Sequence, residues 1–227
     1  MKLPENLEAA LIDMDGVLYD SMPSHARAWK KLFDEIGIPV TFDEFFLYEG
    51  MTGHETINLI FRRHYGHSLS PEETSRLYAK KASYFAAQGE KKIMAAAPRM
   101  LRALKESGIR CILVTGSGQK SILDRVDADF PGIFSDRVTA ADVSRGKPDP
   151  QPYLLGLEKA GCDRSDAIVI ENAPLGVHAG IAAGIFTIAV TTGPVPREAF
   201  EKENASAIFA SMPEFADEIE NFLSLRK

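Results

Sequence analysis

The segment Leu7-Glu8-Ala9-Ala10-Leu11-Ile12-Asp13-Met14-Asp15-Gly16-Val17-Leu18 joins an apolar run to two carboxylates and a glycine. Residues 7–13 predict a buried first strand, which Gly16 ends in a turn. Positions two apart in an extended chain point the same way, so Asp13 and Asp15 can converge on one small volume unless the turn separates them. Two nearby anions repel, and a divalent cation is the simplest compensation. The pair therefore indicates a Mg²⁺ site with a carboxylate nucleophile.

The composition narrows the class of protein. A chain of 227 residues with 45% hydrophobic residues can form one large domain, or one domain that carries an insertion. The net charge of -6 and the pI near 5.5 argue against a nucleic-acid partner, whose binding surface would be basic. An anionic substrate stays possible, because the local charge of a cleft can oppose the net charge.

The two cysteines, Cys111 and Cys162, predict no disulfide framework, and Cys111 is expected to be a small buried residue. Pro4, Glu5 and Glu8 interrupt any secretory signal, and no apolar stretch is long enough to span a bilayer. We therefore expect a cytoplasmic protein with no membrane partner.

Residues from about 20 to 90 predict several helices and no convincing strand. Ser24 is expected to be the N-cap of a helix that runs to about Gly37. Further helices are expected over residues 42–48, 55–65 and 71–88. Ser70 and Glu73 form a capping box around Pro71, which suits the first helical position.

From about residue 98 onward, strands and helices alternate. Strands are predicted at residues 111–115, 167–171, 186–190 and 207–209, and helices at 99–107, 119–127, 150–160, 174–183 and from about 212. This alternation predicts an α/β fold, a Rossmann-like doubly wound parallel sheet with a helical insertion after its first strand. Ligands of such sheets lie beyond the carboxyl ends of the strands, and the insertion leaves from that edge, so it can act as a lid.

Three more polar signals follow predicted strands. The turn Thr115-Gly116-Ser117-Gly118 is typical of an anion cradle at a helix N-terminus, and equally of a helix-capping turn. Lys147 lies in Gly146-Lys147-Pro148, where a solvated loop lysine is the simpler interpretation. Glu171-Asn172 offers oxygen ligands for Mg²⁺, and Asn172 could instead cap the next helix.

Taken together, the segment 13–17, Thr115, Lys147 and Glu171-Asn172 match the four motifs of the haloacid dehalogenase superfamily of phosphohydrolases in order and spacing. The resemblance covers essentially the whole chain. The insertion is similar to the C1-type cap of the β-phosphoglucomutase-like branch, which implies a core of residues 1–20 and 95–227 and a cap of residues 21–94. The stretches around residues 48–50, 114–119 and 170–177 are most similar to a group that hydrolyses inorganic pyrophosphate.

The resemblance implies a role for each motif. Asp13 would attack phosphorus and form an aspartyl-phosphate, and Asp15 would serve as general acid and base. The phosphoryl oxygens would be bound by Thr115 and Lys147, with Ser117 and Gly116 beside them. The implied Mg²⁺ ligands are the side chain of Asp13, the backbone carbonyl of Asp15, and Glu171 and Asn172.

The chain departs from the family pattern at two positions. Asn172 stands where the family more often has a carboxylate, and we hypothesise that the less anionic site suits a highly charged substrate such as pyrophosphate. Gly53 stands where the sugar-phosphate mutases have an arginine that holds the second phosphate of a bisphosphate intermediate.

Three residues of the insertion are further candidates for substrate binding. His25 would orient substrate or gate the cap, or have a purely structural role. Glu49 would reach the metal when the cap closes, or be a solvated helix end. Lys81 would bind the outer phosphate, or be solvated on its helix, whereas Trp29 is expected in the core of the cap.

The leading interpretation is a monomeric Mg²⁺-dependent phosphohydrolase for a small phosphorylated substrate, inorganic pyrophosphate above all. A phosphatase for small sugar phosphates is the second, and β-phosphoglucomutase, which Gly53 disfavours, is the third. A binding protein without catalysis ranks last, because the nucleophile and acid positions are all occupied.

Overall fold

The computed structural model describes residues 3–118 and 120–226. Its main sheet has six parallel strands in the order β5-β4-β1-β6-β7-β8. In chain order these are β1 (Ala9–Ile12), β4 (Arg110–Val114), β5 (Phe134–Val138), β6 (Ala167–Glu171), β7 (Phe186–Val190) and β8 (Ala207–Phe209). The central strand β1 lies between β4 and β6, so the residues that follow these three strands are neighbours. The predicted α/β fold is confirmed.

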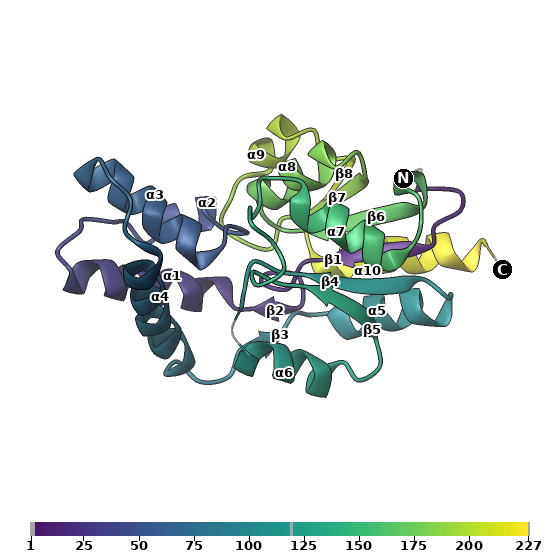
Figure 1. Ribbon diagram of the computed structural model, residues 1–227. Coiled ribbons are helices and arrows are strands. Elements are labelled where there is room, and N and C mark those ends of the chain that lie inside the picture. Colours follow the sequence, from purple (N-terminus) through teal and green to yellow (C-terminus); the bar gives the residue numbers. More distant parts are fainter. Residues whose placement is uncertain (1–2, 119, 227) are drawn as a thin grey trace.

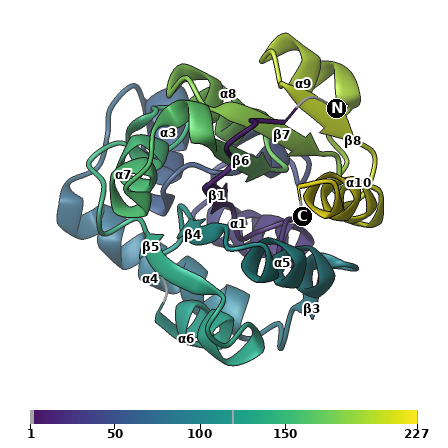
Figure 2. The same ribbon diagram turned by 90° about the vertical axis from the view of Figure 1, so that its right-hand side faces the viewer.

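Helices cover both faces of this sheet (Figure 2). One face packs against α5 (Ala97–Glu106) and α10 (Met212–Ser224), and the other against α7 (Gln151–Ala160) and α8 (Pro174–Ala182). Along β1, Ala10 and Ile12 belong to the first cluster while Ala9 and Leu11 belong to the second, as the alternation of a strand requires. Cys111 is buried as expected. The helix α6 (Lys120–Asp129) packs on the same face as α5 and α10, whereas α9 (Arg197–Lys202) lies beside α8 and β8.

Four helices between β2 and β3 form a separate group to one side of the sheet, which we call the helical unit (Figure 1). They are α1 (Met22–Glu35), α2 (Glu44–Leu47), α3 (Gly53–Tyr65) and α4 (Pro71–Ala86). The interior of the unit is aromatic, with Trp29, Phe33 and Phe45 stacked on one another. Burial of these rings, more than local propensity, holds four short helices together.

The chain enters and leaves the helical unit through a two-stranded ribbon. β2 (Tyr19–Asp20) pairs antiparallel with β3 (Lys92–Ile93), so Tyr19 lies opposite Ile93. The hydroxyl of Tyr19 donates a hydrogen bond to Asp129 at 2.9 Å, which ties the ribbon to α6. The sequence did not predict these two-residue strands, nor β5 or α9.

The first helix begins earlier than predicted. Its N-cap is Ser21, and the expectation that Ser24 is the N-cap was wrong. Pro23 lies in the first turn, where it needs no hydrogen-bonded N–H. Ser24 is already helical, with its N–H bonded to the carbonyl of Ser21 at 2.9 Å.

Most other boundaries differ by a residue or two. The capping box at Ser70 and Glu73 is confirmed, and a second box, which starts α3 at Gly53, moves that helix two residues ahead of its predicted start. The predicted helix 42–48 shrinks to α2. Gln119, the predicted start of the helix 119–127, lies outside the described residues. None of the described helices is both long and apolar enough to cross a bilayer.

Candidate active site

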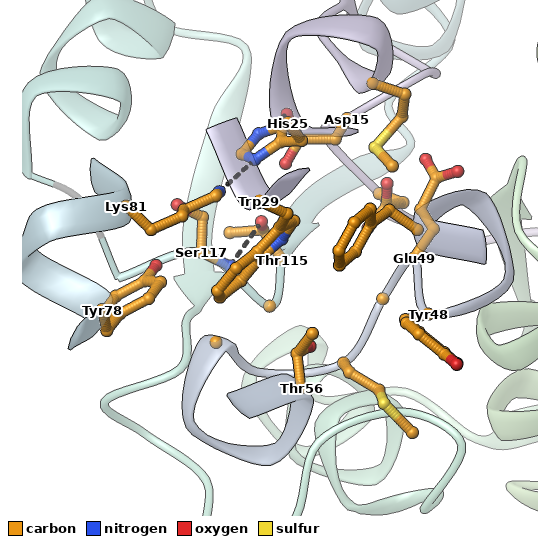
Figure 3. A pocket seen from close by; sticks show the side chains of 17 residues that line it. Asp15, His25, Trp29, Tyr48, Glu49, Thr56, Tyr78, Lys81, Thr115 and Ser117 are labelled. Carbon is orange, nitrogen blue, oxygen red and sulfur yellow. Dashed lines mark hydrogen bonds and ion pairs between the residues drawn. The ribbon is translucent and has the colours of Figure 1, made fainter. Parts of the chain in front are cut away.

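A small cavity lies between the carboxyl edge of the sheet and the helical unit (Figure 3). Its volume is about 60 Å³. Eight predicted site residues line it, namely Asp13, Asp15, His25, Glu49, Lys81, Thr115, Gly116 and Ser117. The other three, Lys147, Glu171 and Asn172, lie outside the cavity lining. Lys147 bonds to Asp13 and Asn172 bonds to Glu49, whereas Glu171 acts one step further away, through Lys147.

Asp13 follows β1 and is bound by a buried lysine. The Lys147 ammonium donates to Asp13 Oδ1 and to Glu171 Oε1, each at 2.6 Å, and to the carbonyl of Val114 at 3.2 Å. Burial raises the pKa of Asp13, and the Lys147 charge opposes that rise without cancelling it. Lys147 is only 1% exposed, so the solvated-loop interpretation was wrong.

Glu171 is fully engaged within the protein. Its Oε1 accepts from Lys147 and from the hydroxyl of Tyr153 at 2.7 Å. Its Oε2 accepts the backbone N–H groups of Asn172 at 2.9 Å and Ala173 at 3.1 Å. With four donors already on it, this carboxylate positions Lys147, and the geometry gives no support to its predicted role as a metal ligand.

The turn after β4 forms a buried polar wall. The N–H of Ser117 donates to Thr115 Oγ1 at 3.0 Å, and both side chains are buried (Figure 3). A Cβ at Gly116 would lie 2.8 Å from the carbonyl oxygen of Gly50 and 2.9 Å from that of Met51. Glycine at position 116 therefore lets the loop of the helical unit close directly over the turn.

Asp15 is held by side chains from α1 and its N-cap. Ser21 Oγ donates to Asp15 Oδ1 at 2.5 Å, and His25 Nε2 lies 3.1 Å from the same oxygen. Burial alone would raise the pKa of Asp15, but the charge and hydrogen bond of His25, with that of Ser21, keep it below its ordinary value. The structure therefore holds Asp15 as a carboxylate that faces the cavity.

Lys81 reaches Asp15 through His25. Its Nζ lies 2.5 Å from His25 Nδ1 (Figure 3). When Lys81 is an ammonium, which only donates, Nδ1 accepts and Nε2 carries the proton toward Asp15. Burial lowers the pKa of Lys81 to about 7, and burial together with the Lys81 charge lowers the pKa of His25. Lys81 lies 4.7 Å over the ring of Trp29 and is buried, so the interpretation as a solvated helix lysine was wrong. Trp29 belongs to the core of the helical unit as expected, and it also lines the cavity.

Glu49 crosses from the helical unit to the sheet. Its Oε1 accepts from Asn172 Nδ2 at 2.7 Å, and it is 7% exposed, so it is no solvated helix end. Burial raises the pKa of Glu49 despite the Asn172 hydrogen bond. A Cβ at Gly16 would lie 1.9 Å from Asn172 Nδ2, so only glycine there leaves room for this amide.

The donor set suits a hard divalent cation. Asn172 Oδ1 is buried and has no hydrogen-bond partner. Asp13 and Glu49 are buried carboxylates and Asp15 is a partly buried one. Burial raises the pKa of Asp13 despite the neighbouring Lys147, so the charge of this carboxylate is not fully compensated within the protein. The described residues contain no cluster of three or more His, Cys, Asp or Glu side chains arranged to hold a metal. A cation here would rely on carbonyl oxygens as well, which Mg²⁺ accepts and softer metals do not favour.

Gly53 opens α3 at the cavity wall opposite the sheet. A Cβ at this position would lie 2.1 Å from the ring of Tyr78 on α4. Tyr78 therefore occupies the space that a longer side chain at position 53 would need.

Three residues that hold the site together were missed from the sequence. Ser21 and Tyr153 carry ordinary hydroxyls with no motif around them. Glu55 had a signal, because Thr52 and Glu55 have the spacing of a capping box. Its carboxylate also accepts the N–H of Gly146, next to Lys147.

Comparison with known proteins gives consistent matches. Residues 7–184 match the family model described as haloacid dehalogenase-like hydrolase. The chain is 31% identical to hexitol phosphatase A of Escherichia coli strain K12, over 79% of this chain and 81% of that protein. It is 30% identical to validoxylamine A 7'-phosphate phosphatase of Streptomyces hygroscopicus subsp. limoneus, over 82% of this chain and 86% of that protein. A solved structure from Bacteroides vulgatus, provisionally named a beta-phosphoglucomutase, superposes with a TM-score of 0.91 at 45% identity, over 96% of this chain and 90% of that one.

Proposed function

Because this chain belongs to the haloacid dehalogenase-like hydrolases, we propose that it is a Mg²⁺-dependent phosphohydrolase that acts on inorganic pyrophosphate through an aspartyl-phosphate. The small space inside this cavity, which stays partly open to solvent, carries the choice of substrate. It measures about 60 Å³, whereas one water needs roughly 10–15 Å³ of such space. This volume favours a leaving group as small as a second phosphate.

The proposed metal ligands are the side chains of Asp13, Asn172 and Glu49 and the backbone carbonyl of Asp15. The unpartnered Asn172 Oδ1 is the observation that supports this set. When bound, Mg²⁺ would neutralise charge on the phosphoryl oxygens and keep the nucleophile ionised.

In the first proposed step a carboxylate oxygen of Asp13 attacks phosphorus. The bond between phosphorus and the bridging oxygen breaks. Asp15, a carboxylate in the resting site, would first take up a proton from solvent, or keep the one that it took from water in the previous turnover, and would give it to the departing oxygen. In the second step Asp15 takes a proton from water, which attacks the phosphorus of the aspartyl-phosphate and releases orthophosphate and free Asp13. Lys147 keeps the Asp13 carboxylate aimed throughout, from 2.6 Å.

The transferring phosphoryl group would be held by the turn after β4. Thr115, Gly116 and Ser117 all line the cavity, and the Ser117 N–H donates to Thr115 Oγ1. The departing phosphate would lie toward Lys81 and His25, the basic side chains among the residues that line the cavity. Phosphoryl transfer depends mainly on such positioning and charge neutralisation.

Gly53 and Tyr78 favour hydrolysis over phosphoryl exchange between sugars. A mutase must hold a bisphosphate while it turns over, and the position of its arginine clamp is here a glycine closed off by the Tyr78 ring. We also propose that residues 1–20 with 95–227 and residues 21–94 act as core and cap, with the helical unit as the lid.

A phosphatase for small sugar phosphates is the second candidate. The cavity wall on the helical unit carries the rings of Trp29, Phe45, Tyr48 and Tyr78, which suit the C–H faces of a sugar or hexitol. The similarity to hexitol phosphatase A supports the same substrate class.

Phosphate release with Mg²⁺ tests the proposal, with pyrophosphate compared against hexose, pentose and hexitol phosphates. We expect a pyrophosphate preference, and a loss of at least about 10³-fold in Asp13→Asn because the nucleophile is gone. Asp20→Asn, an exposed aspartate outside the cavity lining, is the matched control and should equal wild type. Preference for a sugar phosphate would keep the mechanism and replace the substrate. Activity that survives Asp13→Asn would refute the nucleophile.

A further inference from the structure

Two helices of the helical unit begin with the same capping box. In α3 the Thr52 N–H and hydroxyl donate to Glu55 Oε2 at 3.0 and 2.7 Å, and Thr52 Oγ1 accepts the Glu55 N–H at 3.3 Å. In α4 Ser70 and Glu73 repeat these three distances. Both boxes use only the Oε2 atom of the glutamate, so the capping itself leaves Oε1 available.

The second oxygen distinguishes the two glutamates. Glu55 Oε1 accepts the backbone N–H of Gly146 at 2.9 Å, and Gly146 lies in the loop that carries Lys147 on the sheet side of the cavity. Within the described chain, every hydrogen bond of the Glu73 carboxylate stays inside its own box. One box therefore caps a helix, whereas the other also joins that helix to the catalytic loop.

The surfaces around this hydrogen bond fit closely. A Cβ at the buried Gly146 would lie 2.4 Å from Glu55 Oε2, 2.8 Å from Thr52 Cγ2 and 3.0 Å from the Thr52 backbone nitrogen. Any side chain at position 146 would therefore push the start of α3 away from the loop.

The loop before α3 makes a second contact with the same segment. A Cβ at Gly50 would lie 3.1 Å from Cδ and 3.4 Å from Cβ of Lys147, so the Gly50 backbone rests on the aliphatic stem of that lysine. Two successive parts of the helical unit thus contact Gly146 and Lys147.

We propose that Glu55 is a positioning residue that couples closure of the helical unit to the placement of Lys147. When the unit closes, Glu55 binds the Gly146 N–H, Gly50 covers the Lys147 stem, and the ammonium is held between Asp13 and Glu171. The nucleophile would then be fully assembled only when the cavity is shielded from bulk water. The catalytic consequence rests on the proposed function, whereas the coupling itself does not.

Glu55→Ala and Glu73→Ala form a matched pair, because each removes the glutamate side of a capping box with the same geometry. We expect both to lose thermal stability, Glu55→Ala by more because the buried Gly146 N–H also loses its acceptor. Only Glu55→Ala should lower kcat/KM, by about 10- to 100-fold, because it also loosens the loop that carries Lys147. Glu73→Ala should stay within about twofold of wild type.

Amide hydrogen exchange of Gly146, followed by NMR without substrate, is the readout that simple helix capping would not move. We expect about tenfold or faster exchange in Glu55→Ala and no change in Glu73→Ala. Gly146→Ala is a second variant, which keeps Thr52 and Glu55 in the sequence and instead pushes the start of α3 away from the loop, because its Cβ would lie 2.4 Å from Glu55 Oε2. It should lower kcat/KM as Glu55→Ala does.

Equal activity losses in the two glutamate variants, or Gly146 exchange that is the same in all variants, would overturn the proposal. Failure of the wild-type protein to hydrolyse any phosphate would overturn the proposed function alone. The exchange measurement would then still decide whether Glu55 holds the loop.

Discussion

The two walls of the cavity are built in different ways. On the sheet side, Asp13 and Thr115 follow neighbouring parallel strands, and their backbone N–H groups still bond to the next strand, at 3.0 Å to Ile170 and 2.9 Å to Val138. On the helical side, His25 comes from α1, Glu49 from the loop after α2, and Lys81 from α4. Their positions depend on packing and on contacts that cross the cavity.

The two walls therefore differ in how their side chains are positioned, by the sheet backbone on one side and by packing and contacts across the cavity on the other. The backbone ladder fixes the ends of the strands, whereas the placement of Lys147 between Asp13 and Glu171 depends, in the coupling proposed above, on closure of the helical unit. The helical wall reaches the sheet through a few bonds, among them Glu49 to Asn172 and Glu55 to Gly146. Variants on the sheet wall should therefore affect stability most, and variants on the helical wall should affect activity and pH dependence.

The largest effect is expected when the buried lysine of the sheet wall, Lys147, is removed. Lys147→Met would leave the Asp13 and Glu171 carboxylates buried without a counter-charge, which costs about 3–5 kcal/mol of unfolding free energy. Lys159→Met is the matched control, because Lys159 pairs with the exposed Asp136 and should cost about 1 kcal/mol or less. Urea denaturation at pH 7 measures both. Equal losses would show that the sheet wall is no more rigidly preset than the surface.

A smaller effect is expected where the two walls meet. The Asn172 amide donates to Glu49 Oε1 at 2.7 Å. Asn172→Asp puts a second carboxylate next to that of Glu49, and the two repel, so the contact that crosses the cavity is lost. We expect kcat/KM for pyrophosphate to fall by about tenfold. Steady-state phosphate release checks this, with a sugar phosphate measured in parallel. A variant that hydrolyses pyrophosphate as well as wild type would refute the role given to Asn172.

The smallest effect is expected on the helical wall, where Lys81 is buried. Burial lowers its pKa to about 7, so between about pH 7 and pH 10 the unfolded chain binds a proton that the folded protein does not, and stability from this group rises with pH. Lys81→Met removes that dependence. We expect the free energy of unfolding of the variant to exceed that of wild type by about 1 kcal/mol at pH 6, and this difference to shrink toward pH 10.

Thermal unfolding across pH 6–10 measures the Lys81 effect, with its exposed neighbour Lys80 as control. Lys80 pairs with Glu35 at the surface, and Lys80→Met should show no such pH dependence of the difference from wild type. A pH-independent difference for Lys81→Met would mean that the Lys81 ammonium stays charged throughout.

The sequence predicted the sheet wall well, because buried parallel strands are continuous apolar runs whose ends are easy to locate. The strands predicted at 167–171, 186–190 and 207–209 coincide with β6, β7 and β8. The edge strand β5 was missed because Ser135, Asp136 and Arg137 give it no apolar run. The ribbon strands β2 and β3 are too short to leave any periodic signal.

For the residues of the helical wall, the sequence left open whether they belong to the site. Glu49, Lys81 and His25 each had a solvated or structural alternative, because a single polar residue on a helix carries no signal of burial. Their burial results from closure of the helical unit on the sheet, which no local pattern encodes. The capping box at Thr52 and Glu55 was visible in the sequence, but its bond to Gly146, ninety-one residues away, was not.

The ribbon of β2 and β3 has a further consequence for how such a protein can change. Because Tyr19 lies opposite Ile93, the chain enters and leaves the helical unit at one place, as it does in a long loop between two paired strands. The unit can therefore be lengthened, shortened or exchanged without moving β1 or the Asp13 that follows it. A chain built this way can acquire a new specificity by replacing one continuous segment, while Asp13 and Asp15 are inherited unchanged.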